Sequence, residues 1–243
     1  KAMGRIMSQI LMLEALFMLP SLLLGICDGT PKTCMAFVYS MGIILLVAAV
    51  MFLASRGAKK TFFAKEGVVC VGLSWIILSL LGCLPFWFSG EIPAFIDAFF
   101  EIVSGFTTTG ASVVPEVERL SRAVLYWRSF SHWLGGMGVL VFMLTILPMS
   151  GGYHMNLMRA ESPGPSVERF VPTVKSTAKI LYGIYICLSL LELLLLLVGK
   201  MPMFDALTLT FGTAGTGGFG IKNDSIGSYT TYQQTVITIF MIL

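Results

Sequence analysis

The chain has 243 residues, of which 56% are hydrophobic and only 12% are charged, and its mean hydropathy is +0.86. A soluble domain of this size carries about twice that charged fraction, so lipid is expected to surround most of the chain. The net charge of +3 is small, and no basic cluster is interleaved with aromatic residues, which argues against nucleic acid as a partner.

Apolar runs of about 20 residues, the length of a helix that crosses a bilayer, occur five times along the chain. We predict spanning helices at Ile6–Ile26, Met35–Ser55, Gly67–Phe88, Val124–Leu147 and Lys179–Gly199. A sixth apolar run begins near Tyr229 and reaches Leu243. It holds about 15 residues, which is too short to span, so we expect this helix to continue in a longer protein.

The basic residues predict how these helices are oriented, because cytoplasmic loops of membrane proteins are rich in Lys and Arg. Ten of the 16 basic residues lie before the first span, between the second and third, or between the fourth and fifth: Lys1, Arg5, Arg56, Lys59, Lys60, Lys65, Arg159, Arg169, Lys175 and Lys179. We therefore predict a multi-pass protein of the inner (plasma) membrane, with a cytoplasmic N-terminus and membrane lipid around it. The loop Met149–Ser176 is expected to be cytoplasmic and the loop Glu116–Arg119 external.

Two connections on the predicted outer face contain apolar segments that are too short to cross a membrane. These are Pro93–Phe106 and Pro202–Thr213. The first is followed by the sequence TTTGAS at residues 107–112, and the second by AGTGGFG at residues 214–220. Apolar helices of this length are typical of re-entrant or interfacial segments.

The two short segments and the stretches after them form an internal repeat. When the first is shifted by 108 residues, Asp97-Ala98 falls on Asp205-Ala206, Thr108 on Thr216 and Gly110 on Gly218. Each unit therefore consists of a helix, a half-helix, a Thr/Gly stretch and a second helix. We divide the chain into an N-terminal helix pair (1–60), a first repeat (61–150) and a second repeat (151–243).

The Thr/Gly stretches have the chemistry of a cation pore. Irregular backbone occurs at membrane depth only where it is buried in protein or lines a water-filled cavity. Glycine allows dihedral angles that turn several carbonyls toward one axis, threonine adds an uncharged acceptor, and rings of such oxygens can replace the hydration shell of a monovalent cation. A half-helix that dips inward also points its partially negative C-terminal end at the membrane centre. One such stretch is equally well explained as a flexible outer loop, whereas two matched copies favour a pore.

Three segments of the chain resemble a known family. They are SGFTTTGAS at residues 104–112, HWLGGMG at 132–138 and RAESPGP at 159–165. Together they resemble the Trk/Ktr/HKT superfamily of potassium transporters, and most closely its bacterial TrkH-like branch. Phe204-Asp205-Ala206 and Gly217-Gly218-Phe219 resemble the second pore loop of that branch.

The resemblance implies an all-α membrane protein with tandem, potassium-channel-like helix–pore-loop–helix repeats and an extra N-terminal helix hairpin. In the family four repeats surround one pore, and this chain carries two of them. The implied function is potassium uptake through a filter of backbone carbonyls and Thr hydroxyls. Carried over by position, the potassium-binding residues are Thr108, Thr109, Gly110, Thr216, Gly217 and Gly218.

The resemblance also implies the partners. The full-length protein is expected to form a homodimer and to dock a cytoplasmic, TrkA-like, nucleotide-binding regulatory ring. Potassium is the only expected metal, bound at the filter residues, and no organic cofactor is expected in this chain.

The sequence argues against two other classes of function. A membrane enzyme would need a catalytic constellation, but His132 and His154 are the only histidines and neither has a partner at a useful spacing. We therefore predict that the chain is not an enzyme. The alternative is a non-conducting or structural membrane subunit, which would leave the repeated pore loops unexplained.

Several charged and small residues inside the predicted spans allow two interpretations. Glu14 and Glu192 could serve an ion path, but we favour protonated or partnered side chains between helices, because neither lies in a Thr/Gly stretch. The glycine-rich run at 135–138 favours close helix packing over a hinge. The sequence leaves open whether Arg128 pairs with Glu101 behind the filter or anchors the outer headgroups.

Overall fold

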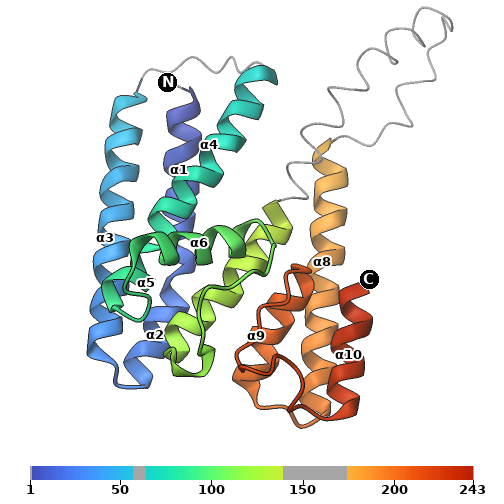
Figure 1. Ribbon diagram of the computed structural model, residues 1–243. Helices are drawn as coiled ribbons and strands as arrows, with labels where there is room; N and C mark the ends of the chain where they lie inside the picture. The colour runs from blue at the N-terminus through green and yellow to red at the C-terminus, as the bar shows by residue number, and fades with distance from the viewer. Residues whose placement is uncertain (1, 57–63, 139–173, 243) are drawn as a thin grey trace, which may run out of the picture.

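The computed structural model describes residues 2–56, 64–138 and 174–242, and within these ranges every regular element is a helix, as predicted (Figure 1). The elements in chain order are α1 (Ala2–Phe17), α2 (Leu19–Cys27), α3 (Pro31–Ala54), α4 (Ala64–Gly82), α5 (Leu84–Ser89), α6 (Phe95–Phe106), a 3₁₀ turn (Val117–Arg119), a helix described over 122–138, α8 (Val174–Val198), α9 (Met203–Ala214) and α10 (Thr231–Ile242).

Four stretches of the described chain are long and apolar enough to cross a membrane, judged by length and composition. They are Met3–Cys27, Pro31–Ala54, Val69–Ser89 and Lys179–Val198, and they coincide with the first, second, third and fifth predicted spans. The fourth predicted span, Val124–Leu147, is helical up to residue 138 and then leaves the described residues, as does most of the loop Met149–Ser176.

Two of the predicted single spans are each divided into two helices. The first breaks between α1 and α2 at Met18, and the third breaks between α4 and α5 at Cys83. Pro20 and Pro85 are the second residues of α2 and α5. A proline in a helix has no N–H to donate, and its ring clashes with the carbonyl four residues earlier, so it interrupts the hydrogen-bond ladder at these points.

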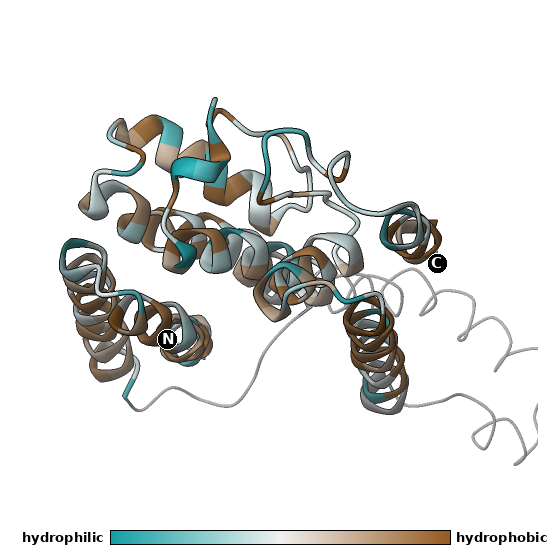
Figure 2. Cartoon of the chain, turned by 90° about the horizontal axis from the view of Figure 1, so that it is seen from below, coloured by the Kyte–Doolittle hydropathy of each residue, from teal (hydrophilic) through white to brown (hydrophobic). Residues whose placement is uncertain are grey.

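The outward sides of the long helices are apolar. Leu23, Leu46 and Val198 are 60%, 65% and 75% exposed, respectively. Figure 2 shows hydrophobic residues along the sides of the helices and hydrophilic residues in several of the connecting turns. Apolar surface on this scale is unusual on a soluble monomer and normal on helices that face lipid.

Two hydrophobic clusters hold the helices together. The larger joins α1, α3, α5, α6, the 122–138 helix and, through Phe211, α9. The smaller joins α8, α9 and α10. Trp127 is fully buried in the larger cluster, and its Nε1 donates to the Gly82 carbonyl, 2.9 Å away, beside the break between α4 and α5. The 122–138 helix thereby fixes the position of the N-terminal half of the first repeat.

The two predicted half-helices are present as α6 and α9, with 12 residues each. In Figure 1 α6 crosses beside α4, and α9 packs beside α8. Each short helix therefore contacts the long helix that begins its repeat. The chain then continues through an irregular stretch into the 122–138 helix in the first repeat and into α10 in the second. Both units therefore share the order long helix, half-helix, irregular stretch and helix, and the first also contains α5 and the 3₁₀ turn.

Candidate functional site

The end of α6 turns the chain sharply into the first Thr/Gly stretch. The Thr108 N–H donates to the Gly105 carbonyl at 3.0 Å, and the Thr109 N–H donates to the Ser104 carbonyl at 2.9 Å. This pair of bonds, one spanning three residues and one spanning five, closes a helix with a left-handed residue at its end. Thr108 occupies that left-handed position, where glycine is the usual residue.

The end of α9 repeats this geometry. The Thr216 N–H donates to the Thr213 carbonyl at 2.7 Å, and the Gly217 N–H donates to the Gly212 carbonyl at 3.1 Å. Each of these four residues lies 108 positions after its counterpart in the first repeat. The internal repeat detected in the sequence is therefore also a repeat of backbone hydrogen bonds.

Both stretches place threonine and glycine at positive φ in the same order. Thr108 and Thr216 each have a φ of 55°, while Gly110 and Gly218 have φ values of 73° and 79°. A β-branched residue at positive φ is rare, and strain of this kind costs about 1–3 kcal/mol. In each stretch the residue between the two has negative φ, and this alternation lets successive carbonyls turn toward the same side of the chain.

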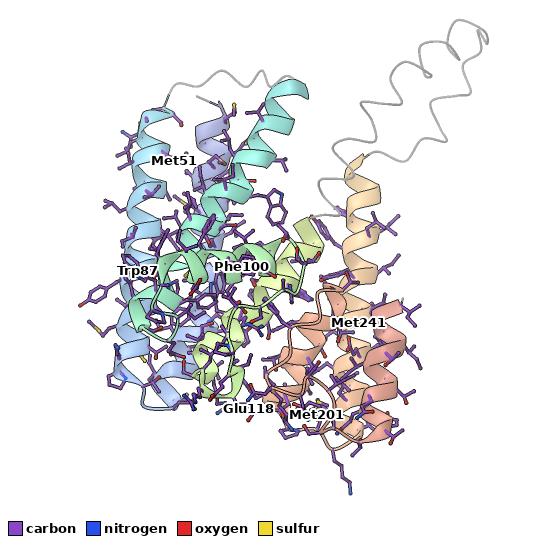
Figure 3. All side chains as sticks on the ribbon, in the orientation of Figure 1. Met51, Trp87, Phe100, Glu118, Met201 and Met241 are labelled. Atoms are coloured by element: carbon purple, nitrogen blue, oxygen red, sulfur yellow. The ribbon has the colours of Figure 1, made fainter. Side chains whose placement is uncertain are left out.

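The two stretches approach each other at the level of the backbone. A Cβ added to Gly110 would collide with the backbone carbonyl of Gly217, and a Cβ on Gly217 would collide with the His132 ring. Met241, which projects from α10 (Figure 3), brings its Cε to 3.1 Å from the position of a Cβ on Gly218. Gly110 and Gly217 therefore lie where there is no room for a side chain, whereas at Gly218 the positive φ of 79° is the main constraint.

The 122–138 helix backs both stretches through its glycine-rich end. A Cβ on Gly135 would meet the Phe106 carbonyl and the methyl group of Thr108, and one on Gly136 would meet the Tyr185 hydroxyl. A Cβ on Gly138 would lie 2.7 Å from the Trp75 ring. The close-packing interpretation of this run is confirmed.

A buried ion pair joins this helix to both repeats. Arg128 Nε donates to Glu101 Oε1 at 2.6 Å, and the side chains are 2% and 0% exposed. Arg128 Nη1 donates to the Gly220 carbonyl at 2.8 Å, and the guanidinium carbon lies 3.5 Å from the centre of the Phe219 ring. One guanidinium thus contacts α6 of the first repeat and the Thr/Gly stretch of the second, so of the two roles left open for Arg128 the structure shows the pair with Glu101.

The Glu101 carboxylate also holds the chain that follows the first stretch. Its Oε1 accepts from Ser112 Oγ at 2.8 Å, and its Oε2 accepts from the Val113 N–H at 3.0 Å. A buried ion pair is tolerated when its remaining lone pairs are occupied in this way. The sequence offered no signal for Ser112 or Val113 as partners, because they follow α6 through an irregular turn.

The buried carboxylates of Glu14 and Glu192 are not explained by pairing. Their residues are 3% and 1% exposed, and none of their oxygens has a hydrogen-bond partner among the described residues. Glu192 lies in α8 yet lines the same cavity as Thr108 and Thr216. Glu192 lies outside both Thr/Gly stretches, as the sequence shows, but the packing of α8 against α9 brings it to a cavity that both stretches line.

Comparison with known proteins decides the family. The family model TrkH, described as "Cation transport protein", matches residues 34–243. The chain belongs to the TrkH cation transport family. Its members are cation transport proteins rather than enzymes, which confirms the prediction that the chain is not an enzyme.

Individual relatives agree with this assignment. The Trk system potassium uptake protein TrkH of Halomonas elongata is 38% identical over 229 residues, which cover 93% of this chain and 47% of that protein. The protein of the same name from Escherichia coli K12 is 37% identical over 220 residues, covering 89% of this chain and 45% of that protein. The chain spans about half the length of the curated relatives it matches.

A solved structure confirms the fold class. The crystal structure of the potassium transporter TrkH from Vibrio parahaemolyticus superimposes with a TM-score of 0.81 and 29% sequence identity, over 98% of this chain and 48% of that one. The chain is therefore an all-helical, multi-pass membrane protein of the TrkH family, as the resemblance implied.

Proposed function

We propose that the chain takes part in potassium uptake across the inner membrane, with its two Thr/Gly stretches as segments of the ion filter. The observation that carries this proposal is the matched pair of backbone turns after α6 and α9. They share their hydrogen bonds and their pattern of positive φ, and they meet where Gly110 faces the Gly217 carbonyl. The names of the relatives, potassium uptake proteins, supply the ion.

The chemistry of the two turns suits a weakly hydrated monovalent cation. The C-terminal ends of α6 and α9 carry partial negative charge next to the two stretches, which favours a cation and disfavours an anion. The stretches add backbone carbonyls and Thr hydroxyls without adding a formal charge. The proposed potassium-binding residues are Thr108, Thr109, Gly110, Thr216, Gly217 and Gly218.

The arrangement of the whole protein is part of the same proposal. It divides into the N-terminal helix pair (1–60), the first repeat (61–150) and the second repeat (151–243), with the N-terminus in the cytoplasm. From the family resemblance, the full-length protein forms a homodimer and docks a TrkA-like nucleotide-binding ring on its cytoplasmic side.

Uptake of radioactive rubidium, which substitutes for potassium, tests this function. The full-length protein is expressed in cells that lack their own potassium uptake, and uptake is compared with that of cells carrying an empty vector. The proposal predicts uptake that potassium inhibits competitively. Normal amounts of protein in the membrane without rubidium uptake would favour the alternative, a non-conducting structural subunit.

A further inference from the structure

A cavity of about 260 Å³ lies at the inner ends of the two half-helices. Thr108, which follows α6, and Thr216, which follows α9, both line it. The opposite wall comes from α8 and includes Tyr185, Ser189 and Glu192. The cavity therefore joins residues of both Thr/Gly stretches to one carboxylate on a neighbouring helix.

Glu192 is the only formally charged side chain that lines this cavity among the described residues. It is 1% exposed, and neither of its oxygens accepts a hydrogen bond in the described part of the chain, because the neighbouring Thr213 hydroxyl donates to the Leu209 carbonyl at 2.9 Å instead. A carboxylate without a partner is costly to bury at membrane depth, so its presence here calls for a ligand or a proton.

The hydroxyl oxygens of Tyr185 and Ser189 keep lone pairs for a cation, although Ser189 Oγ also accepts from Trp133 Nε1 at 3.1 Å. The Tyr185 hydroxyl donates to the Trp133 carbonyl at 3.1 Å, and the Ser189 hydroxyl donates to the Tyr185 carbonyl at 2.9 Å. Both hydroxyl protons are therefore bound to carbonyls. The partially negative ends of α6 and α9 face the same space, and they favour positive charge in it.

We infer that this cavity is a second site for a monovalent alkali cation, with the Glu192 carboxylate as its charged ligand. The inference rests on the proposed function, since it takes the neighbouring stretches to be the path of the ion. Because a water molecule occupies roughly 30 Å³ in the liquid, the cavity has room for a cation with several of its waters. A partly hydrated ion would bind here next to the filter.

Glu14 provides a matched control within the same chain. It is also buried, at 3% exposure, and its oxygens also lack a partner among the described residues. Its cavity of about 380 Å³ is lined mainly by apolar side chains, including Phe17, Trp75 and Phe106, and by no residue of the two Thr/Gly stretches. Glu14 should therefore hold a proton and bind no cation.

Carbodiimide labelling separates the two carboxylates. Dicyclohexylcarbodiimide modifies protonated carboxyl groups in apolar surroundings, and the modified peptides of the purified full-length protein are quantified by mass spectrometry. Potassium or rubidium, compared with choline at equal ionic strength, should reduce modification of Glu192 severalfold and leave that of Glu14 unchanged. Modification of Glu192 that is equal in potassium and choline, or that changes in parallel with Glu14, overturns the inference.

Transport kinetics provide a second measurement that does not require either carboxyl to react. Glu192→Gln should raise the half-saturating rubidium concentration about tenfold, as expected for the loss of one charged contact, while Glu14→Gln leaves it unchanged. A wild-type value in Glu192→Gln overturns the inference.

If the wild-type protein takes up rubidium but Glu192 is neither protected nor required, the second site is wrong and the proposed function stands. If the wild type takes up no rubidium, the proposed function is wrong.

Discussion

Thr108 and Thr216 show that strain in the Thr/Gly stretches is repeated rather than accidental. Both have the same φ of 55° at the same point after a half-helix. Glycine would remove the strain there, at a cost of about 0.5–1 kcal/mol in conformational entropy. The retention of threonine in both copies agrees with a need for its hydroxyl or its stiffness at the proposed filter.

This strain predicts the thermal stability of two neighbouring variants. Thr108→Gly should leave the unfolding temperature of the purified full-length protein unchanged or raise it, because relief of strain offsets the entropy cost. Thr107→Gly is the control, since Thr107 has a φ of −85° and gains no relief. It should lower stability by about 1 kcal/mol. An equal loss in both variants, measured by thermal unfolding in detergent, would show that Thr108 is not strained.

At the scale of elements, Arg128 joins three of them. It extends from the 122–138 helix, pairs with Glu101 of α6, and donates to Gly220 after α9. Removal of one partner of a buried ion pair is strongly destabilising, by about 3–5 kcal/mol, because the remaining charge is left without compensation. The two Thr/Gly stretches should therefore lose their relative position when this pair is broken.

We expect Arg128→Gln to reduce the amount of folded protein in the membrane severely, and Glu101→Gln combined with it to restore part of the loss. Arg122→Gln is the control. Arg122 pairs with Asp28 at 3.1 Å, but their side chains are 51% and 23% exposed, so the loss should be below about 1 kcal/mol. Fluorescence-detected gel filtration of the full-length variants measures the folded fraction. Similar losses in Arg128→Gln and Arg122→Gln would contradict the bridging role.

The sequence predicts those features of the structure that depend on residues close together in the chain. Length and hydropathy located the long helices and the two half-helices, because these are properties of contiguous residues. Pro20 and Pro85 are signals for a helix break. The long apolar runs around them nevertheless favour unbroken spans, so the two breaks were not predicted. The cavity position of Glu192 was missed, because it depends on α8 packing behind α9, which no spacing along the chain encodes.

At the scale of the whole molecule, the ends of the described helices separate into two groups. The N-terminal end of α1, the C-terminal end of α3 and the start of α4 lie at the upper end of Figure 1, whereas the turn between α2 and α3 lies at the lower end. Glu118 and Met201 are at the lower end as well (Figure 3). This separation is compatible with the orientation predicted from the basic residues.

Single cysteines test that orientation. In a full-length background without the native cysteines, Arg119→Cys should react with an impermeant thiol reagent in intact cells, because it lies in the predicted external loop and its side chain is 80% exposed. Arg56→Cys, at the end of α3, should react only after the cells are opened. If Arg56→Cys were labelled in intact cells and Arg119→Cys were not, the true orientation would be the opposite of the predicted one.

The central claim, that the two Thr/Gly stretches form part of a potassium filter, is tested most directly by substitution of Gly110. Serine there would direct its Cβ at the Gly217 carbonyl, whereas Gly72 in α4 has no atom within 4 Å of an added Cβ and serves as the control. Rubidium and sodium uptake by the full-length variants is measured relative to the amount of protein in the membrane. We predict that Gly110→Ser reduces the abundance of the protein, because the added Cβ collides with backbone. In the protein that reaches the membrane it should lower the rubidium-to-sodium ratio about tenfold, a change equivalent to about 1.4 kcal/mol in relative ion binding. Thr109→Ser should have a milder effect, because serine keeps both the carbonyl and a hydroxyl, and Gly72→Ser should have none. Wild-type uptake and discrimination in Gly110→Ser would show that the stretch is an ordinary loop and would contradict the filter assignment.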